Sequence, residues 1–220
     1  MLKADLHVHT NEDPLDFSKI NYSARDLIKY AAKLHYNVLA ITNHNSILYD
    51  HMLKSYAKKH GILLIPGTEA DIEGKEILLL NVKKHNTKNI SGLHKLRKQD
   101  ILTVAPHPFY PKLKSLHSKL IKNIDCFDAI EYSHFYCKFF NPFNKKAVKI
   151  ARKYKKPLIG TSDAHNLSQM NHTFSLIDAK PKIDSVLEAV RKSKIIIKTE
   201  PLSFKHYFIT GLKALPYMFR

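Results

Sequence analysis

The sequence predicts an α/β fold, and a small, irregular barrel is its most direct interpretation. Short β-branched runs alternate with longer segments of helical periodicity, which is typical of βα units and a parallel sheet. Six or seven such units fit into 220 residues, whereas a full eight-fold barrel takes about 250 residues. An open doubly wound sheet is the alternative. The chain has six glycines and no glycine-rich phosphate loop, so the nucleotide-binding versions of that sheet find no support.

Strands are predicted where aliphatic and β-branched residues form short runs. In chain order these runs cover residues 4–10, 37–44, 61–70, 75–82, 101–108, 128–135, 157–165 and 195–200. Gly74 separates the third run from the fourth and favours a hairpin between them. Apolar residues at helical spacing predict helices over residues 23–35, 47–60, 93–100, 112–123, 145–156 and 185–194. Ser23 is a suitable N-cap for the first of these helices.

The chain is expected to form one barrel domain over residues 1–200, followed by a basic, aromatic tail over residues 201–220. We expect this tail to pack on the barrel, and a helix that binds a membrane surface or a partner protein is the alternative. No apolar run is long enough to cross a bilayer, and the N-terminus has no signal-peptide pattern. A cytoplasmic protein without membrane association is therefore expected.

The balance of charge is strongly basic. Lysine and arginine number 36 against 19 acidic residues, which gives a net charge of +17. Such a surface attracts anions and speeds their encounter with the protein. The lysines are dispersed along solvated helix faces, however, so the charge indicates an acidic ligand only weakly.

Histidines and carboxylates follow one predicted strand after another at its carboxyl end. In a parallel barrel these ends open on one face, where active sites are built. Imidazole and carboxylate together form a ligand set that suits zinc, iron or manganese. The candidate metal ligands are His7, His9, His44, Glu69, His107, Glu131, His134, Asp163 and His165.

The spacing of these residues also indicates more than one ion. Alternate residues of a strand point the same way, so His7 and His9 can reach one ion while Val8 faces the core. The whole set exceeds the four ligands that a zinc ion usually takes. Two or three ions that share a bridging carboxylate, with Glu69 as the candidate, would use them all. Clustered ions acidify a bound water and stabilise an anionic transition state, which suits hydrolysis at phosphorus.

The motifs DLHVHT, ITNHN, GTEA, APHP, EYSH and GTSDAH, in this order, resemble those of the polymerase and histidinol phosphatase (PHP) domain family. The resemblance runs from Asp5 to about His165. It implies a distorted seven-stranded (β/α) barrel of the TIM type, up to three ions of manganese, zinc or iron, and phosphoesterase activity.

The resemblance also implies how the ligands divide among the ions. One ion would be held by His7, His9, Glu69 and Asp163. A second would be held in part by His44 and His165, and a third by Glu69, His107 and His134. Glu131 would lie behind the ligands or act as an optional ligand.

Two positions depart from the family pattern. Asn43 stands where the second motif usually has an aspartate, and this removes a carboxylate from behind the ligands. Some members also carry a histidine or aspartate shortly after the first motif. Asp13 and Asp16 are the nearest candidates here, so the second ion site is expected to be weaker or to use a different ligand.

We therefore expect a metal-dependent phosphoesterase that cleaves a small phosphate ester through a metal-bridging hydroxide. His107, His134 and Asp163 are the expected catalytic residues, and Lys75, Lys112 and Lys138 are candidates for binding the anion. The first alternative is a nuclease or nucleoside-bisphosphate phosphatase that acts on nucleic-acid ends. Others are a non-catalytic scaffold or RNA-binding subunit of the same family, and an amidohydrolase-type barrel, which commonly bridges its metals with a modified lysine.

Overall fold

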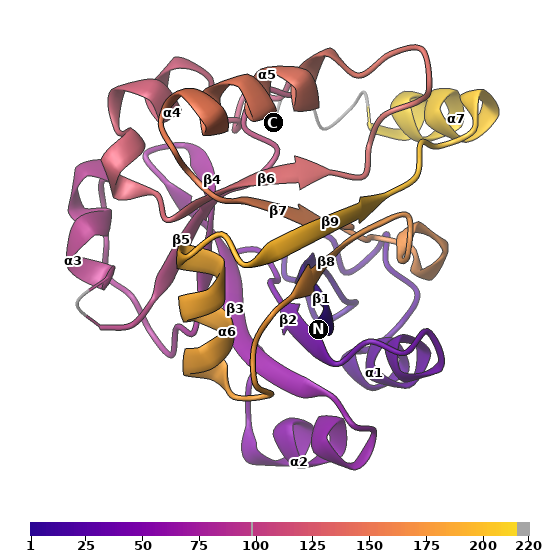
Figure 1. Ribbon diagram of the computed structural model, residues 1–220. Coiled ribbons are helices and arrows are strands. Elements are labelled where there is room, and N and C mark those ends of the chain that lie inside the picture. Colours follow the sequence, from indigo (N-terminus) through magenta and orange to yellow (C-terminus); the bar gives the residue numbers. More distant parts are fainter. Residues whose placement is uncertain (98, 215–220) are drawn as a thin grey trace.

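The computed structural model describes residues 1–97 and 99–214. These residues form a mixed α/β domain in which a nine-stranded sheet curves into a nearly closed barrel with helices around its outside (Figure 1). The strands are β1 (Leu2–Val8), β2 (Val38–Ile41), β3 (Leu63–Ile72), β4 (Lys75–Leu80), β5 (Leu102–Ala105), β6 (Ala129–Ser133), β7 (Leu158–Thr161), β8 (Thr173–Ile177) and β9 (Ile195–Thr199). The helices are α1 (Ala24–Lys33), α2 (His51–Lys59), α3 (His94–Arg97), α4 (Ser118–Lys122), α5 (Pro142–Lys153), α6 (Ile183–Arg191) and α7 (Phe204–Ala214).

The predicted barrel is confirmed as an architecture, but the expected number of seven strands is wrong. The sheet order is β7-β6-β5-β4-β3-β2-β1-β8-β9. Two antiparallel pairs enlarge it, the hairpin β3–β4 and the pair β8–β9, whose strands are connected through α6, so β4 and β8 run against the other strands. The predicted hairpin at Gly74 is confirmed, since Glu73 and Gly74 both have the positive φ of a type I′ turn. The sequence interpretation missed β8, whose five residues alternate between buried and half-buried.

The barrel closes where β7 meets β1. The backbone N–H of Asp163 donates to the carbonyl of His7 at 2.9 Å, and that of His9 donates to the carbonyl of Ala164 at 3.1 Å. These two bonds join the first and the last of the histidine-containing motifs. Farther down the barrel, Gly160 lies against the β8–β9 pair, and its N–H donates to Ser175 Oγ at 2.9 Å.

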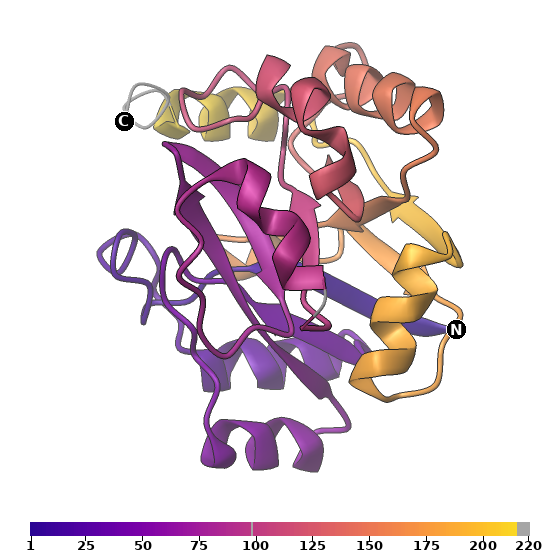
Figure 2. The ribbon, with the colours of Figure 1, turned by 90° about the vertical axis from the view of Figure 1, so that its left-hand side faces the viewer.

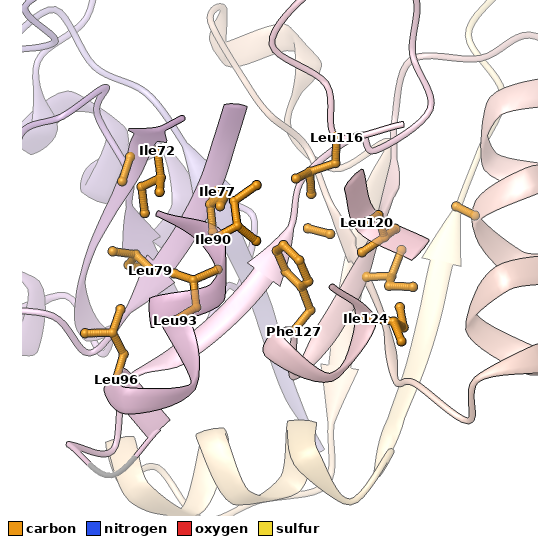
Figure 3. Close-up of a cluster of buried hydrophobic side chains, with 14 of the residues drawn as sticks. Ile72, Ile77, Leu79, Ile90, Leu93, Leu96, Leu116, Leu120, Ile124 and Phe127 are labelled. Atoms are coloured by element: carbon orange, nitrogen blue, oxygen red, sulfur yellow. The ribbon is translucent and has the colours of Figure 1, made fainter. Parts of the chain in front are cut away.

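The hydrophobic core has an inner part and an outer part. The barrel interior holds side chains of β1 to β8, and residues of α6 belong to the same cluster, so α6 covers one end of the interior. Outside the sheet, one cluster lies under α1 and α2, and the other lies under α3, α4 and α5. In Figure 2, α4 and α5 lie at the top and α1 and α2 at the bottom. In the cluster under α3, α4 and α5, Leu93 and Leu96 face Ile77 and Leu79 of β4, while Leu120 packs near Phe127 (Figure 3). The candidate ligands occupy the end of the barrel away from α6.

Two further predictions concern the N-cap of α1 and the C-terminal tail. Ser23 caps α1 as predicted and forms a reciprocal capping box with Asp26. Of the predicted tail over residues 201–220, the part up to residue 214 contains α7, and residues 215–220 lie outside the described residues. Tyr207 of α7 stacks on Phe135 with ring centroids 4.7 Å apart. Within residues 1–97 and 99–214, no helix combines the length and apolar character needed to span a bilayer.

Candidate metal centre

A bulge in β1 turns the side chains of His7 and His9 toward the mouth of the barrel. From Asp5 to Val8 the strand advances three residues while its partner β2 advances two. Strict alternation from Asp5, which faces the helices, would have sent both imidazoles outward as well. The extra residue shifts the phase, so Val8 packs in the outer core and the two histidines face the interior.

Four ligand atoms from β1, β3 and the loop after β7 converge at this mouth. His7 Nε2 and His9 Nε2 lie 3.1 Å apart. Glu69 Oε2 is 3.5 Å from the first nitrogen and 3.4 Å from the second, and Asp163 Oδ1 is 3.3 and 3.4 Å from them. A tetrahedron of ligand atoms about 2.1 Å from an ion has edges of about 3.4 Å. Each of the two carboxylates is therefore spaced from both imidazoles as ligands of one divalent ion would be, and His7, His9 and Glu69 form one group of candidate ligands.

Glu131 lies directly behind His7. Its Oε1 accepts a hydrogen bond from His7 Nδ1 at 2.7 Å and another from Thr161 Oγ1, and its Oε2 accepts from the backbone N–H of His107. With Nδ1 held by the carboxylate, Nε2 of His7 presents its lone pair toward the other ligands. Glu131 therefore orients one ligand and fixes the backbone of another.

Asp13 places a carboxylate against two of the candidate ligands, His9 and His44. Asp13 Oδ2 accepts from Nδ1 of both His9 and His44 at 2.9 Å, and from the backbone N–H of His44 at 2.8 Å. Asn43 instead bonds Thr10 through both atoms of its amide. Burial alone would raise the pKa of Asp13, but its hydrogen bonds to the two imidazoles hold it well below the usual range. One fully buried carboxylate thus orients two candidate ligands.

A second group of ligand atoms surrounds Glu69. Its Oε2 lies 3.1 Å from His44 Nε2, and its Oε1 lies 3.1 Å from His107 Nε2. The same Oε2 belongs to the group around His7 and His9. The two oxygens of Glu69 therefore face different imidazoles, which is the geometry of a carboxylate that can join neighbouring ions.

His134 is buried without a partner. Neither of its ring nitrogens has a hydrogen bond among the described residues, and the same holds for Nδ1 of His107. Burial lowers the pKa of His134 to about 4, so its imidazole is neutral near pH 7. A buried, neutral imidazole with both nitrogens unsatisfied is costly, and a metal ion would satisfy one of them.

His165 stands at the outer edge of the cluster, where it meets Asp16. Its Nε2 lies 3.0 Å from Asp16 Oδ2, and His44 Nδ1 lies 3.9 Å from the same oxygen. The ring of His165 stacks on that of His9, with centroids 4.4 Å apart. Of the two aspartates considered after the first motif, Asp13 thus lies behind the histidines and Asp16 faces the rim beside His165.

Two of the candidate residues have a left-handed backbone. The φ angle is 26° at His107 and 47° at Asp163. Aspartate tolerates this region better than most residues, whereas histidine at φ 26° is strained. Backbone strain of this kind concentrates at functional sites, because the surrounding structure holds a side chain where chemistry needs it.

Glu76 is a member of the cluster that the sequence interpretation missed. It is buried on β4, with Oε1 3.9 Å from His44 Nε2 and Oε2 3.7 Å from His107 Nε2. The predicted ligands all lie at the carboxyl ends of strands, whereas β4 runs the other way and brings its first residues to the same rim. The predicted hairpin at Gly74 was the signal that could have found it, since a hairpin places the start of its second strand beside the end of its first.

Parts of the chain are similar in sequence to known proteins. Residues 141–195 match the model of a family described as PHP-associated, and this segment includes Asp163 and His165. An uncharacterized protein of Methanocaldococcus jannaschii is 31% identical over 141 residues, which are 58% of this chain and 82% of that protein.

Solved structures share the fold. A two-domain protein of Bacteroides vulgatus that contains a predicted PHP-like metal-dependent phosphoesterase superimposes with a TM-score of 0.68 at 17% identity, covering 96% of this chain and 69% of the other. The lesion-specific endonuclease of Pyrococcus furiosus gives a TM-score of 0.58 at 14% identity, covering 96% of this chain and 66% of the endonuclease. With its ordered motifs and its cluster of histidines and carboxylates, the chain belongs to the polymerase and histidinol phosphatase (PHP) domain family.

Proposed function

We propose that the protein hydrolyses a small phosphate ester with two or three divalent ions bound at the mouth of the barrel. The observation that carries this proposal is that carboxylate oxygens of Glu69 and Asp163 each lie 3.3–3.5 Å from the Nε2 atoms of His7 and His9, which are 3.1 Å apart. The imidazoles and carboxylates form a mixed set of nitrogen and oxygen ligands, which suits manganese, iron or zinc.

The residues divide into groups that would hold different ions. His7, His9, Glu69 and Asp163 would hold the first. His44, His165 and Asp16 would border a second position, and Glu69 and His107 would border a third, for which we propose His134 as the further ligand. When bound, the ions would acidify a water molecule and neutralise the charge that develops on the phosphoryl group. His107 or His134 would relay a proton to the departing oxygen, and Asp163 would help to hold the first ion.

Among the three lysines considered for binding the anion, Lys112 has the best position. Its Nζ lies 3.2 Å from Glu76 Oε2, at the rim of the ligand cluster. Lys75 donates instead to the backbone carbonyl of Leu113. Lys138 lies over the ring of Phe139, with its Nζ 6.0 Å from the ring centroid. We assign Lys112 to the phosphoryl group of the substrate.

The test combines metal content with turnover. His9→Ala and Asp163→Ala should both lose bound metal and the hydrolysis of p-nitrophenyl phosphate, because each removes a ligand from the first group. His51→Ala is the matched control, since this exposed imidazole lies at the start of α2, outside the cluster. Full metal content and full activity in either ligand variant would refute the assignment, as would the absence of metal from the unaltered protein after manganese or zinc is added back.

A second candidate function is the trimming of nucleic-acid ends. A groove beside α5 is lined by Tyr132, Asn141, Val148 and three basic side chains, Lys145, Lys149 and Arg152. Basic groups beside an aromatic ring suit a nucleic-acid strand, and one structural relative is an endonuclease. Affinity for a short single strand should then fall steeply with salt and weaken in Lys149→Ala. If affinity changes neither with salt nor in Lys149→Ala, this second candidate function is wrong and only the small-substrate proposal stands.

A further inference from the structure

Residues at the start of β4 lie at the candidate metal centre, although none of the ordered motifs includes them. Asp71 at the end of β3 pairs with Glu76, and Glu69 pairs with Leu78. Directly paired residues in an antiparallel ladder point to the same face. Leu78 lies in the barrel interior, so Glu76, two residues before it, faces the barrel on the side of Glu69 and the ligand cluster.

Glu76 is buried and incompletely satisfied. Its side chain is 6% exposed, and Oε2 has no hydrogen bond among the described residues. Lys112 Nζ is at ion-pair distance, 3.2 Å, yet the contact does not meet the geometry of a hydrogen bond. A carboxylate this deeply buried is costly unless it is paired or binds a metal.

The two oxygens of Glu76 face the same two imidazoles as those of Glu69. Oε1 of Glu76 lies 3.9 Å from His44 Nε2, and Oε2 lies 3.7 Å from His107 Nε2. Glu69 also directs one oxygen to each of these imidazoles, both at 3.1 Å. The ligand atoms of His44, Glu69 and Glu76 all lie within 4.8 Å of one another, close enough to share an ion.

We propose that Glu76 is a direct metal ligand, which completes with His44 and Glu69 a carboxylate-rich position for one ion of the centre. The inference rests on the proposed metal-dependent function and adds a ligand to its site. Two carboxylates and one imidazole form a harder ligand set than the one around His7 and His9. This position should therefore prefer manganese to zinc more strongly than a histidine-rich one.

The test measures manganese binding to the metal-free protein by titration calorimetry, and bound metal per chain by elemental analysis after gel filtration. Glu76→Gln keeps the size of the side chain and removes its charge. Loss of a partner behind a ligand costs about 10–100-fold in metal affinity, so loss of this direct ligand should weaken one ion by at least about 100-fold or remove it. Glu76→Asp keeps the charge but withdraws the carboxylate, so it should lower the affinity for the same ion. It replaces Glu76→Gln in the test if that variant does not fold.

Two controls separate a ligand from a structural ion pair. Asp71→Asn removes the neighbouring carboxylate, which is paired with Lys114 at 3.0 Å, and should leave the metal count unchanged. Lys112→Met removes the partner of Glu76 and should also keep every ion.

Two outcomes distinguish a failure of this inference from a failure of the proposed function. If Glu76→Gln binds as much manganese as the unaltered protein, with the same affinity, this inference is wrong and the proposed function stands. If the unaltered protein binds no divalent ion, the proposed function falls and this inference falls with it.

Discussion

Replacing Asp13 with asparagine should weaken two metal positions at once. One carboxylate oxygen, Oδ2, accepts from the rings of both His9 and His44 and from the backbone N–H of His44. The other oxygen accepts from the backbone N–H groups of Leu15 and Asp16 at 2.8 and 3.2 Å. Asparagine offers one acceptor oxygen and one NH2 group, so it cannot serve both sets of donors.

The structure gives the size of the effect. The amide oxygen should turn to the three donors around His44, which leaves two backbone donors facing an NH2 group. The free energy of unfolding should therefore fall by about 1–3 kcal/mol. The imidazoles lose a charged acceptor, and loss of such a partner behind a ligand costs about 10–100-fold in metal affinity. That equals about 1.4–2.7 kcal/mol of binding free energy for each ion affected.

Calorimetric titration of the metal-free Asp13→Asn variant with manganese measures these affinities, and urea unfolding measures stability. Asp128→Asn is the control. It removes another buried carboxylate, one that accepts from the backbone N–H of Thr103 at 3.0 Å, and should lower stability without changing metal affinity. If Asp13→Asn binds every ion as tightly as the unaltered protein, the idea that Asp13 orients both imidazoles for metal binding is wrong.

Three further predictions follow from single contacts. Burial raises the pKa of Asp5 from 3.8 to about 7, so the folded state binds more protons than the unfolded state across this window. Stability of the chelated protein should fall between pH 4 and 7 by up to about 4 kcal/mol more than in Asp5→Asn, and parallel pH profiles in urea unfolding would contradict this. Gly160→Ala would place a methyl group 2.7 Å from Ile197 Cγ2. Thermal unfolding should show that the free energy of unfolding falls by about 1–3 kcal/mol, and an unchanged midpoint would mean that the contact between β7 and β9 can relax. Glu131→Gln should weaken the ion at His7 by about 10–100-fold in the same calorimetric titration, whereas unchanged affinity would show that packing alone orients the ring.

Much of the candidate site could be predicted because it obeys a local rule. Strands of a parallel barrel share one direction, so residues that follow them in sequence meet at one end in space. His7, His9, Glu69 and Asp163 are far apart in the chain, yet each follows or ends a recognisable strand. The structure brings one oxygen of each carboxylate within 3.5 Å of the Nε2 atoms of both histidines.

The number of strands could not be predicted by the same rule. β8 has only five residues, and a short alternating run is weak evidence for a strand. Its place is set by pairing with β1 on one side and β9 on the other. The bulge in β1 also depends on a partner strand, because an extra residue becomes visible only when β1 is compared with β2.

Asn43 shows that a residue missing from a motif need not leave the neighbouring imidazole without a carboxylate. A family pattern records where a charged residue usually stands in the sequence, whereas an imidazole is affected by the charge that lies beside it in space. In this chain Asp13, thirty positions before Asn43, contacts the rings of His44 and His9. The expectation of a weaker second site stays a prediction.

The reversed direction of β4 extends this argument to the whole rim of the barrel. A strictly parallel barrel supplies ligands from carboxyl ends alone, and every ordered motif in this chain follows that rule. An antiparallel strand inserted into the same sheet supplies its first residues instead, which is how Glu76 comes to face His44 and His107. A chain that lacks a carboxylate at one motif position can therefore carry one at another position of the rim. The charge of the cluster then depends on every residue that lies at the rim of the barrel, whichever strand supplies it.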